Sequence, residues 1–445
     1  MAEQEKNAAG PARVTPCLMS EFPTRHILNN EVHSRPFIQV GSPARCCHMA
    51  ILTGEAGRNA DLEHLAALCR HYNLPTPPAD CSHQIIDFGT FRLKWERHTE
   101  FCSYTFLRKG MGRNPFLDTA LSVVPEEWLK SIPGQLLVGV HLYLGKVPES
   151  ENDQREMLEE IFGANMVLGA LAGSIGAQVW TDFHIHGDGF CRILVNDSGM
   201  SETQAGRLVQ RLLEIETYRM MAMLAVPLTG EISKATREIE QELADVVQQM
   251  MSVDDPAREH EILDRLTRMA ARVEHLSAGS TYRFNASKAY YALVEKRIEN
   301  IREEPLKGFQ TISSFLERRI APAMRTCVSM EDRIANLSRR VNRASTLLQT
   351  RINTTLQAQN KQLLESMDRR ARLQLRLQQT VEGLSVVAIS YYALGIINYL
   401  ARGGQEILPS IDPYIVTAAA APIVIFGVFW FLRRLHKVIR KASES

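Results

Sequence analysis

Two long stretches without a charged side chain lie close together near the C-terminal end of the sequence. Residues 383–401 and 413–432 contain no Asp, Glu, Lys or Arg. A helix rises 1.5 Å per residue, so each stretch has about the length that crosses a hydrocarbon core of about 30 Å. Tyr399 and Trp430 lie near the ends, where interface-seeking rings are found. The alternative, two helices buried in a soluble core, is disfavoured because two such stretches are neighbours. The sequence therefore predicts a transmembrane hairpin over residues 381–432.

Basic residues around this hairpin predict its orientation. Four arginines precede the first span, five basic residues follow the second, and the connecting loop holds only Arg402. The flanking residues are Arg369, Arg370, Arg372, Arg376, Arg433, Arg434, Lys437, Arg440 and Lys441. The positive-inside rule places both termini in the cytoplasm, and these side chains could also contact anionic lipid. We expect residues 433–445 to form a basic cytoplasmic tail.

The N-terminal residues and the composition restrict the compartment and the partners. Residues 1–20 are polar and lack the apolar core of a secretory signal, so we expect a flexible tail that stays in the cytoplasm. A formal net charge of +1 gives no basic field for nucleic acid. The eight cysteines form no Cys-x-x-Cys pair, which indicates reduced thiols and argues against a zinc ribbon.

Residues 21–230 combine strand and helix patterns and are predicted to form one α+β cytoplasmic domain. Residues 91–95 alternate apolar and charged side chains, the pattern of a half-buried strand. Other predicted strands cover residues 101–107, 136–144, 175–186 and 190–195, and predicted helices cover 61–72, 150–171 and 201–224. Gly187-Asp188-Gly189 indicates a β-hairpin between the last two strands. Residues 21–60 are expected to be loop-like.

Residues 231–380 lack strand patterns and are predicted to form a helical stalk. Apolar residues repeat there at spacings of three and four, as in the heptad seam of a coiled coil: Ile334, Leu337, Val341, Ala344 and Leu348. The stripe continues through Ile352, Leu356, Leu363 and Met367. It must be buried against either residues 231–304 of the same chain or a second copy of the chain, and the sequence leaves both open. The expected partners are the lipid bilayer and, through the stalk and the membrane helices, further copies of the chain.

Five segments spread over nearly the whole chain carry a family resemblance. They are HILNNEVHSRP (26–36), KWERHTEFCSYTF (94–106), DFHIHGDGFCRILV (182–195), QAGRLVQRLLEIETYRMMAM (204–223) and EGLSVVAISYYALGIINYLARG (382–403). They resemble a family of bacterial membrane-anchored proteins classed only as a domain of unknown function. The resemblance implies an inner-membrane protein of bacteria with this layout, and it implies no activity.

The layout is also similar to that of CorA-type magnesium transporters. These have an N-terminal α/β domain, a long stalk helix, two C-terminal membrane helices and a basic tail. Their Gly-Met-Asn hallmark at the end of the first span has no counterpart here, since the corresponding stretch reads Gly395-Ile396-Ile397-Asn398. The resemblance covers the layout alone, and a shared layout does not establish a shared function.

Polar residues that could bind a ligand gather first in the loop-like region before residue 50. His26, Glu31, His33 and His48 lie there with Arg35. Histidine and glutamate are ligands for zinc and similar ions, and loops often carry binding residues. The spacing matches no metal motif, so we favour a hydrogen-bonded loop packed on the domain.

A second candidate group follows the first predicted strand. Glu96, His98 and Glu100 share one face of an extended chain, and a carboxylate beside a histidine can tune it for proton transfer. We favour the simpler interpretation, a turn between two strands with a salt-bridged rim, because charged strand faces are usually solvated.

The third group is His184, His186 and Asp188. A His-x-His pair on a strand places both imidazoles on one face, which is a known zinc-binding arrangement. Asp188 is explained more simply by the hairpin turn, and no later histidine-rich stretch supplies further ligands. No cofactor is therefore predicted, and a divalent metal at these residues is the alternative.

The fourth group lies on the predicted helix over residues 201–224. Arg207, Arg211, Glu214 and Tyr218 fall on neighbouring turns of one face. They could bind an acidic ligand or contact the stalk, but we favour a salt-bridged face opposite the apolar one.

No motif for catalysis stands out in the sequence. There is no phosphate-binding loop, no Gly-x-Ser-x-Gly elbow and no His-Glu-x-x-His. The leading hypothesis is therefore a non-enzymatic, membrane-anchored scaffold or interaction module that faces the cytoplasm. The alternatives are a CorA-like oligomeric ion channel and a metal-dependent enzyme that uses the N-terminal histidines.

Overall fold

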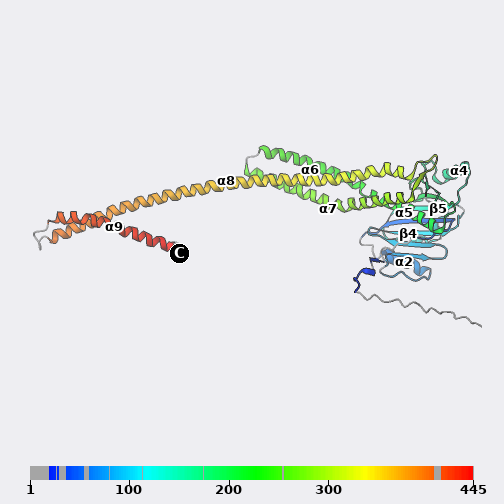
Figure 1. The fold of residues 1–445 in the computed structure, drawn as a ribbon, viewed down its shortest axis with the longest axis horizontal. Helices are drawn as coiled ribbons and strands as arrows, with labels where there is room; N and C mark the ends of the chain where they lie inside the picture. Colours follow the sequence, from blue (N-terminus) through cyan, green and yellow to red (C-terminus); the bar gives the residue numbers. More distant parts are fainter. Residues whose placement is uncertain are drawn as a thin grey trace, which may run out of the picture. The chain divides into compact units, whose positions relative to one another are not determined.

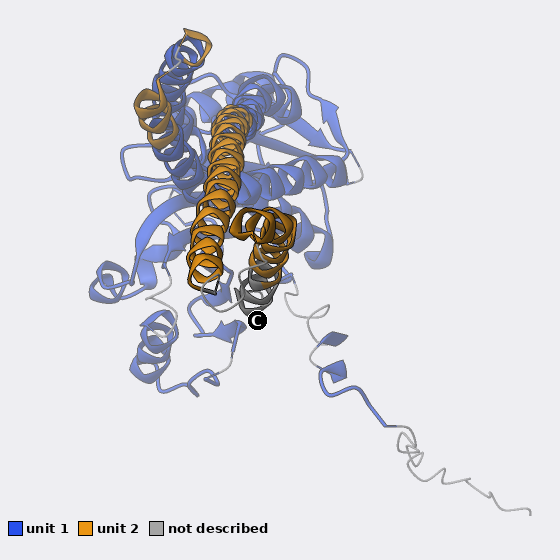
Figure 2. Cartoon of the chain, turned by 90° about the vertical axis from the view of Figure 1, so that its left-hand side faces the viewer, with its two compact units in different colours: residues 1–249, 265–342 blue, residues 250–264, 343–445 orange. Residues whose placement is uncertain are grey.

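The described chain divides into two compact units. A computed structural model describes residues 20–443 apart from residues 27, 30–36, 55–59, 80, 113, 174, 253–254 and 405–411, with the side chains of residues 404 and 435–443 also left out. One unit comprises residues 1–249 and 265–342, and the other comprises residues 250–264 and 343–445 (Figure 2). The α/β domain, and the candidate site described below, lie in the first unit.

Nine strands of the described chain form a single mixed sheet with the order β2-β3-β4-β1-β5-β8-β7-β6-β9. The strands are β1 Ala44–Leu52, β2 His83–Asp87, β3 Arg92–Arg97, β4 Phe101–Lys109, β5 Gln135–Gly145, β6 Leu168–Ala172, β7 Ala177–Thr181, β8 Cys191–Asn196 and β9 Glu303–Pro305. Strand β1 is antiparallel to both of its neighbours, β4 and β5. Only the β5–β8 pair among these strands is parallel.

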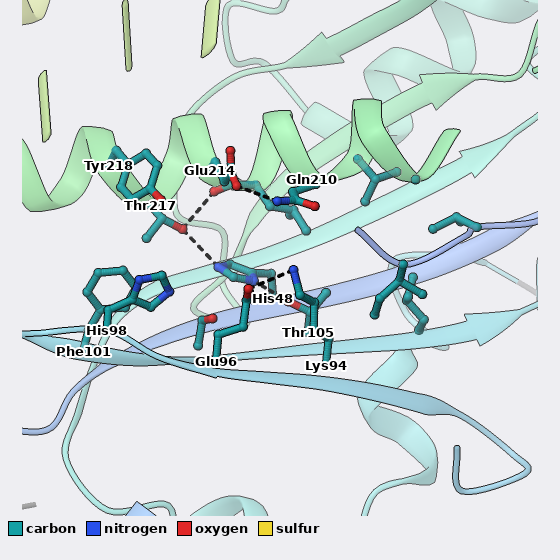
Figure 3. Close-up of a pocket in the computed structure, with 17 residues that line it drawn as sticks. His48, Lys94, Glu96, His98, Phe101, Thr105, Gln210, Glu214, Thr217 and Tyr218 are labelled. Atoms are coloured by element: carbon teal, nitrogen blue, oxygen red, sulfur yellow. Dashed lines mark hydrogen bonds and ion pairs between the residues drawn. The ribbon is translucent and has the colours of Figure 1, made fainter. Parts of the chain in front are cut away.

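Helices cover both faces of this sheet. On one face, α2 Ala60–His71 and α3 Glu126–Lys130 pack on the strands around β1, and α4 Glu151–Phe162 packs on β5, β7 and β8. On the other face lies α5, Glu202–Met223. The first face is apolar over β1 and β3, with Met49, Leu93 and Trp95 in its core. Because side chains alternate along a strand, the intervening residues of β1 and β3 face α5 (Figures 1 and 3).

Most of the predicted elements of the α/β domain are confirmed. The predicted helices over residues 61–72 and 201–224 are α2 and α5, and the predicted strands over residues 91–95, 101–107 and 136–144 are β3, β4 and β5. The predicted hairpin is confirmed as well, since β7 pairs with β8 in antiparallel register and the Gly189 amide donates to the carbonyl of His186 at 2.9 Å. The fold class is therefore a mixed α/β domain followed by long helices.

Three parts of the prediction were wrong. The predicted helix over residues 150–171 ends at Phe162, because Gly163 adopts a φ of 64°, and strand β6 follows. The predicted loop over residues 21–60 contains β1, an interior strand of the sheet that lies between β4 and β5. The predicted strand over residues 175–186 ends at Thr181, since residues 182–186 leave the ladder and Phe183 has a φ of 51°.

Three long helices follow the domain: α6 Val226–Ser252, α7 Pro256–Ile301 and α8 Ile312–Gly404. Within the first unit they lie side by side (Figure 1), with ion pairs between Arg272 and Glu242 at 3.1 Å and between Arg333 and Glu240 at 2.5 Å. Leu337 and Val341 of the heptad stripe are buried there. In this unit the stripe is therefore covered by helices of the same chain.

Two helices of the described chain are long and apolar enough to cross a membrane. They are α8, and the part of α9 (Pro413–Ser443) up to Arg434. The mean hydropathy reaches 1.6 in α8 and 2.3 in α9, and almost none of either apolar window is buried. Large apolar side chains such as Tyr391 and Phe426 are more than 70% exposed. Length and composition thus agree with the two predicted spans.

Candidate functional site

A small cavity lies between α5 and the face of the sheet that carries polar side chains (Figure 3). Its volume is about 60 Å³. The polar residues that line it are His48, Lys94, Glu96, His98, Ser103, Thr105, Gln210, Glu214 and Thr217, with Tyr218 at one end. Strands β1, β3 and β4 form its floor and α5 forms its roof. Residues from three of the four candidate groups in the sequence therefore meet here.

The strand register arranges the floor of the cavity in two rows. Lys94 is the register partner of Thr105, and Thr105 is the partner of His48, so these three residues form a row across β3, β4 and β1. Glu96 is the partner of Ser103 in the next row. These residues share the α5 face because each lies two positions from its neighbour along its strand.

His48 is held between the sheet and α5 by two hydrogen bonds. The Thr217 hydroxyl donates its only hydrogen to the carbonyl of Leu213 at 2.8 Å, so it accepts from Nε2 of His48 at 3.0 Å. Nδ1 of His48 then accepts from the Thr105 hydroxyl at 2.8 Å. Complete burial, together with the nearby Lys94 and His98, lowers the pKa of His48 from 6.5 to about 3. This histidine is therefore neutral at physiological pH and fixed in one tautomer.

Lys94 and Glu96 form an ion pair inside the cavity. The Lys94 ammonium lies 3.0 Å from the Glu96 carboxylate, and both side chains are buried. Figure 3 shows both side chains pointing from β3 toward α5. The expectation of a solvated, salt-bridged rim was therefore wrong for Glu96, because α5 covers this part of the strand. His98 lines the same cavity from the turn after β3 and stacks on Phe101 with ring centroids 4.2 Å apart.

Helix α5 presents one face to the cavity. The helix begins with a capping box in which Ser201 and Gln204 satisfy each other's backbone amides. Gln210, Glu214 and Thr217 then lie at spacings of four and three, so they share one face. Glu214 accepts from Gln210 Nε2 at 2.7 Å and also pairs with Arg297 of α7. Arg297 of α7 therefore holds Glu214, and with it the α5 side of the cavity, in place.

The remaining candidates on the turn and on α5 have structural partners. Glu100 pairs with Arg283 of α7, and burial and the Glu100 carboxylate raise the pKa of Tyr290. Arg211 donates to the carbonyl of Asn300 at 2.9 Å, and burial lowers its pKa. These contacts attach α7 to the domain.

Arg207 and His26 lie outside the cavity. The Arg207 guanidinium stacks on the ring of Phe37, 4.9 Å from its centroid. His26 pairs with Glu21 at 2.8 Å on the surface. Glu31, His33 and Arg35, the other members of the first candidate group, lie outside the described residues. Of the two members that the structure describes, His26 and His48, only His48 lines the cavity.

His184, His186 and Asp188 lie in the loop after β7. His186 pairs with Asp182 at 3.0 Å, His184 is exposed, and Asp188 accepts from the backbone amide of Phe190 at 3.0 Å. The two imidazoles are thus not presented by a strand. Across the part of the chain that the structure describes, no group of three or more His, Cys, Asp or Glu side chains is placed to hold a metal ion.

Sequence reasoning missed five polar lining residues: Lys94, Ser103, Thr105, Gln210 and Thr217. Lys94 and Glu96 stand at alternate positions of β3, and Ser103 and Thr105 do so in β4. The sequence pattern that could have revealed them is a pair of adjacent strands with polar residues on one face and aromatic residues on the other. The helix that buries the polar face could not be inferred from that pattern.

The chain was also compared with known proteins. The sequence model of the family DUF3422, described as a protein of unknown function, matches residues 20–439. No curated protein and no solved structure matches the chain. The matched residues include the sheet, α5, the long helices and both apolar helices. Because the match spans most of the sequence, the chain belongs to this family, whose description assigns it no activity.

Proposed function

We propose that the protein is a membrane-anchored interaction module whose α/β domain faces the cytoplasm. The observation that carries the proposal is the pair of apolar helices α8 and α9, whose apolar windows are almost fully exposed. Exposed apolar surface of this extent is unfavourable in water, and helices of this length and composition are stable in lipid. The scaffold function is supported by the site, whose candidate residues mostly hold elements of the domain together.

The orientation is proposed from the charges that flank the apolar helices. Arg372 and Arg376 precede the first span, and Arg433 and Arg434 follow the second. Arg372 pairs with Asp368 at 2.7 Å in an exposed position, so it stays accessible to solvent or to lipid headgroups. Because moving arginine across the bilayer is costly, both ends of the hairpin remain on the cytoplasmic side of a bacterial inner membrane.

Fractionation of cells tests the anchor. The full chain should remain in the membrane pellet after washes with high salt and with alkaline carbonate, because apolar burial resists both. A chain that ends at residue 380 retains the basic residues before the first span but lacks both spans, so it should appear in the soluble fraction. If the truncated chain sediments as firmly as the full chain, the anchor lies elsewhere and the proposal is wrong.

We also propose that copies of the chain pair in parallel through α8 after the first unit. Leu356, Leu363 and Met367 lie on one side of this helix and are more than 50% exposed. Asn360 lies within the same stripe. Two chains anchored in one membrane have the same orientation, so identical stripes meet in register and Asn360 meets its own copy, as polar core residues do in parallel coiled coils.

Disulfide cross-linking in membranes tests this pairing. Leu363→Cys lies on the stripe, and Glu365→Cys lies on the opposite side of the helix and is the matched control. Both are made in a chain with Cys17 and Cys81 replaced by serine. Oxidation should give a covalent dimer for Leu363→Cys and little for Glu365→Cys. Equal cross-linking at both positions would indicate random collision and would contradict the pairing.

A second candidate function is an oligomeric ion channel. It is favoured by one observation: α8 is a continuous helix that begins beside β9 of the sheet and contains the first apolar stretch. A ring of such helices would provide a pore along a common axis. Ion flux into vesicles that contain the purified protein tests this function, and a protein that is monomeric in bilayers would exclude it.

A further inference from the structure

The ion pair in the cavity has unused hydrogen-bonding capacity. Lys94 is 5% exposed and Glu96 is 9% exposed, and each has only the other as a charged partner among the described residues. An ammonium has three donors and a carboxylate accepts about four hydrogen bonds, so most of this capacity is free. Buried charges are stable only when such groups are satisfied. The cavity therefore requires a polar occupant.

Ser103 adds a third group at the same place. Ser103 is 2% exposed, its side chain lines the cavity, and it stands opposite Glu96 in the register. A hydroxyl can donate one hydrogen bond and accept two. Lys94, Glu96 and Ser103 thus offer a positive donor, a negative acceptor and a neutral hydroxyl around one space.

The volume limits the size of the occupant. The cavity measures about 60 Å³. A cavity needs about 10–15 Å³ of volume to hold one water molecule, which is one non-hydrogen atom. This cavity therefore accepts about four to six non-hydrogen atoms. Nucleotides, sugars and most metabolites with rings are too large for it. The occupant is either a few water molecules or a very small polar compound.

The charges indicate the chemistry of that compound. A simple anion would meet the carboxylates of Glu96 and Glu214, and a simple cation would meet Lys94. A molecule with a carboxylate and an ammonium can pair with Lys94 and Glu96 together. Leu107, Val209 and Leu213 add apolar surface to the lining. We propose that this cavity binds a small zwitterion, namely one of the smallest α-amino acids, glycine or alanine.

His48 contributes shape to this site and no charge. Both of its ring nitrogens are bonded to Thr105 and Thr217, and both hydroxyl hydrogens are also used, so these groups offer a ligand no further donor. Their network fixes the distance between β1 and α5 and so sets the height of the cavity. The inference concerns the α/β domain alone and does not depend on membrane anchoring.

The experiment measures ligand binding by the purified full chain in detergent. Glycine and alanine are titrated while thermal unfolding is followed, since a ligand that binds only the folded state raises Tm. The matched probes are acetate and methylammonium, which each carry one of the two charges, and urea, which is polar and neutral. Glycine or alanine should give a saturable rise in Tm that the single-charge probes and urea do not give at equal concentration.

Variants connect the binding to the named groups. Lys94→Met combined with Glu96→Leu removes both charges at once, which avoids leaving one buried charge unpaired, so the chain should still fold. This variant should lose the response to glycine and alanine. Ser103→Ala should weaken binding about tenfold through the loss of one hydrogen bond. Glu63→Gln, an exposed change on α2, is the control and should bind like the unmodified chain.

Three results would overturn the proposal. The first is an unmodified chain whose Tm does not respond to glycine or alanine. The second is an equal response to urea or acetate, which would show a hydrated polar cavity without selectivity for a zwitterion. The third is a folded double variant, judged by circular dichroism, that still responds to glycine or alanine. None of these results bears on membrane attachment, so the two proposals fail independently.

Discussion

His48 is a buried histidine that is neutral in the folded domain, and this gives the stability of the domain a defined pH dependence. In the unfolded chain a histidine takes up a proton below pH 6.5, whereas His48 in the folded chain resists protonation down to a pKa of about 3. The stability that neutral His48 contributes is fully present above pH 6.5, and it is lost progressively as the pH drops toward 3. At pH 4.5 the loss should be about 2–3 kcal/mol in the free energy of unfolding.

Urea unfolding of the full chain in detergent, at neutral pH and at about pH 4.5, measures this loss. His48→Gln keeps an amide near Thr217 but does not titrate, so its stability should fall less between the two conditions. His141, whose pKa burial lowers to about 4, titrates in both proteins and cancels in the comparison. Identical losses in both proteins would show that His48 is not the group responsible.

Asp61 is a buried carboxylate whose charge stabilises the fold. It is fully buried, holds the guanidinium of Arg97 at 2.6 and 3.0 Å, and accepts from the thiol of Cys102 at 2.5 Å. Asp61→Asn leaves Arg97 without its counter-ion and should cost about 3–5 kcal/mol. The control is Glu63→Gln on the same helix, which breaks an exposed pair with Arg70 and should cost less than about 1 kcal/mol. The urea midpoints of the two variants give both values, and similar midpoints would contradict the assignment.

At the scale of elements, the approach of α5 to the chain before β1 depends on one glycine. A Cβ at Gly206 would lie 2.0 Å from the carbonyl oxygen of Ile38, a backbone atom that cannot give way. Gly206→Ala should therefore displace α5, open the cavity and destabilise the chain by about 1–3 kcal/mol. Gly279→Ala in α7 is the matched control: nothing lies within 4 Å of its Cβ, and it should stabilise the helix by about 0.5–1 kcal/mol. Thermal unfolding that shifts in the same direction for both variants would argue against this close contact.

Periodicity in the sequence revealed most elements of the α/β domain, and the exceptions have physical reasons. Helices α2 and α5 carry clear apolar stripes, and β3 alternates strictly. Strand β1 reads ARCCHMAIL and is buried on both faces, so it shows no alternation and its polar residues resembled a loop. Helix α4 was extended too far because Leu168–Ala172 suits a helix as well as a buried strand.

The site was harder to predict than the fold. Glu96 and His98 were singled out on a strand and its turn, and His48 within a supposed loop, but their meeting depends on the pairing of β1 with β4. A register cannot be deduced from one strand alone. The burial of Lys94 and Glu96 depends on α5, a helix more than one hundred residues later in the chain. Local patterns therefore found candidate side chains, and only tertiary structure decided which of them share a cavity.

For the whole molecule, the proposed membrane hairpin raises the question of which side of the membrane each segment occupies. Residues 402–412 hold one basic side chain, Arg402, whereas the segments outside the two spans hold many. Inserting the hairpin with this short loop outward moves one arginine across the lipid, and the reverse orientation would move nine basic residues. A basic residue placed at the centre of a membrane helix costs about 2.5–3.5 kcal/mol on the translocon scale, so the orientation that moves one arginine is favoured.

Two fusions in a bacterial host test this orientation. Alkaline phosphatase, which is active only outside the cytoplasm, should be active when it is fused after residue 407 in the loop and inactive when fused after residue 445. Replacing Arg433, Arg434, Lys437, Arg440 and Lys441 by glutamine removes the positive charge behind the second span. This change should produce a fraction of chains with the C-terminus outside, seen as phosphatase activity at residue 445. A loop fusion that is inactive while the C-terminal fusion is active would reverse the proposed topology, and inactivity at both positions in a stable, membrane-bound chain would mean that the two helices do not cross.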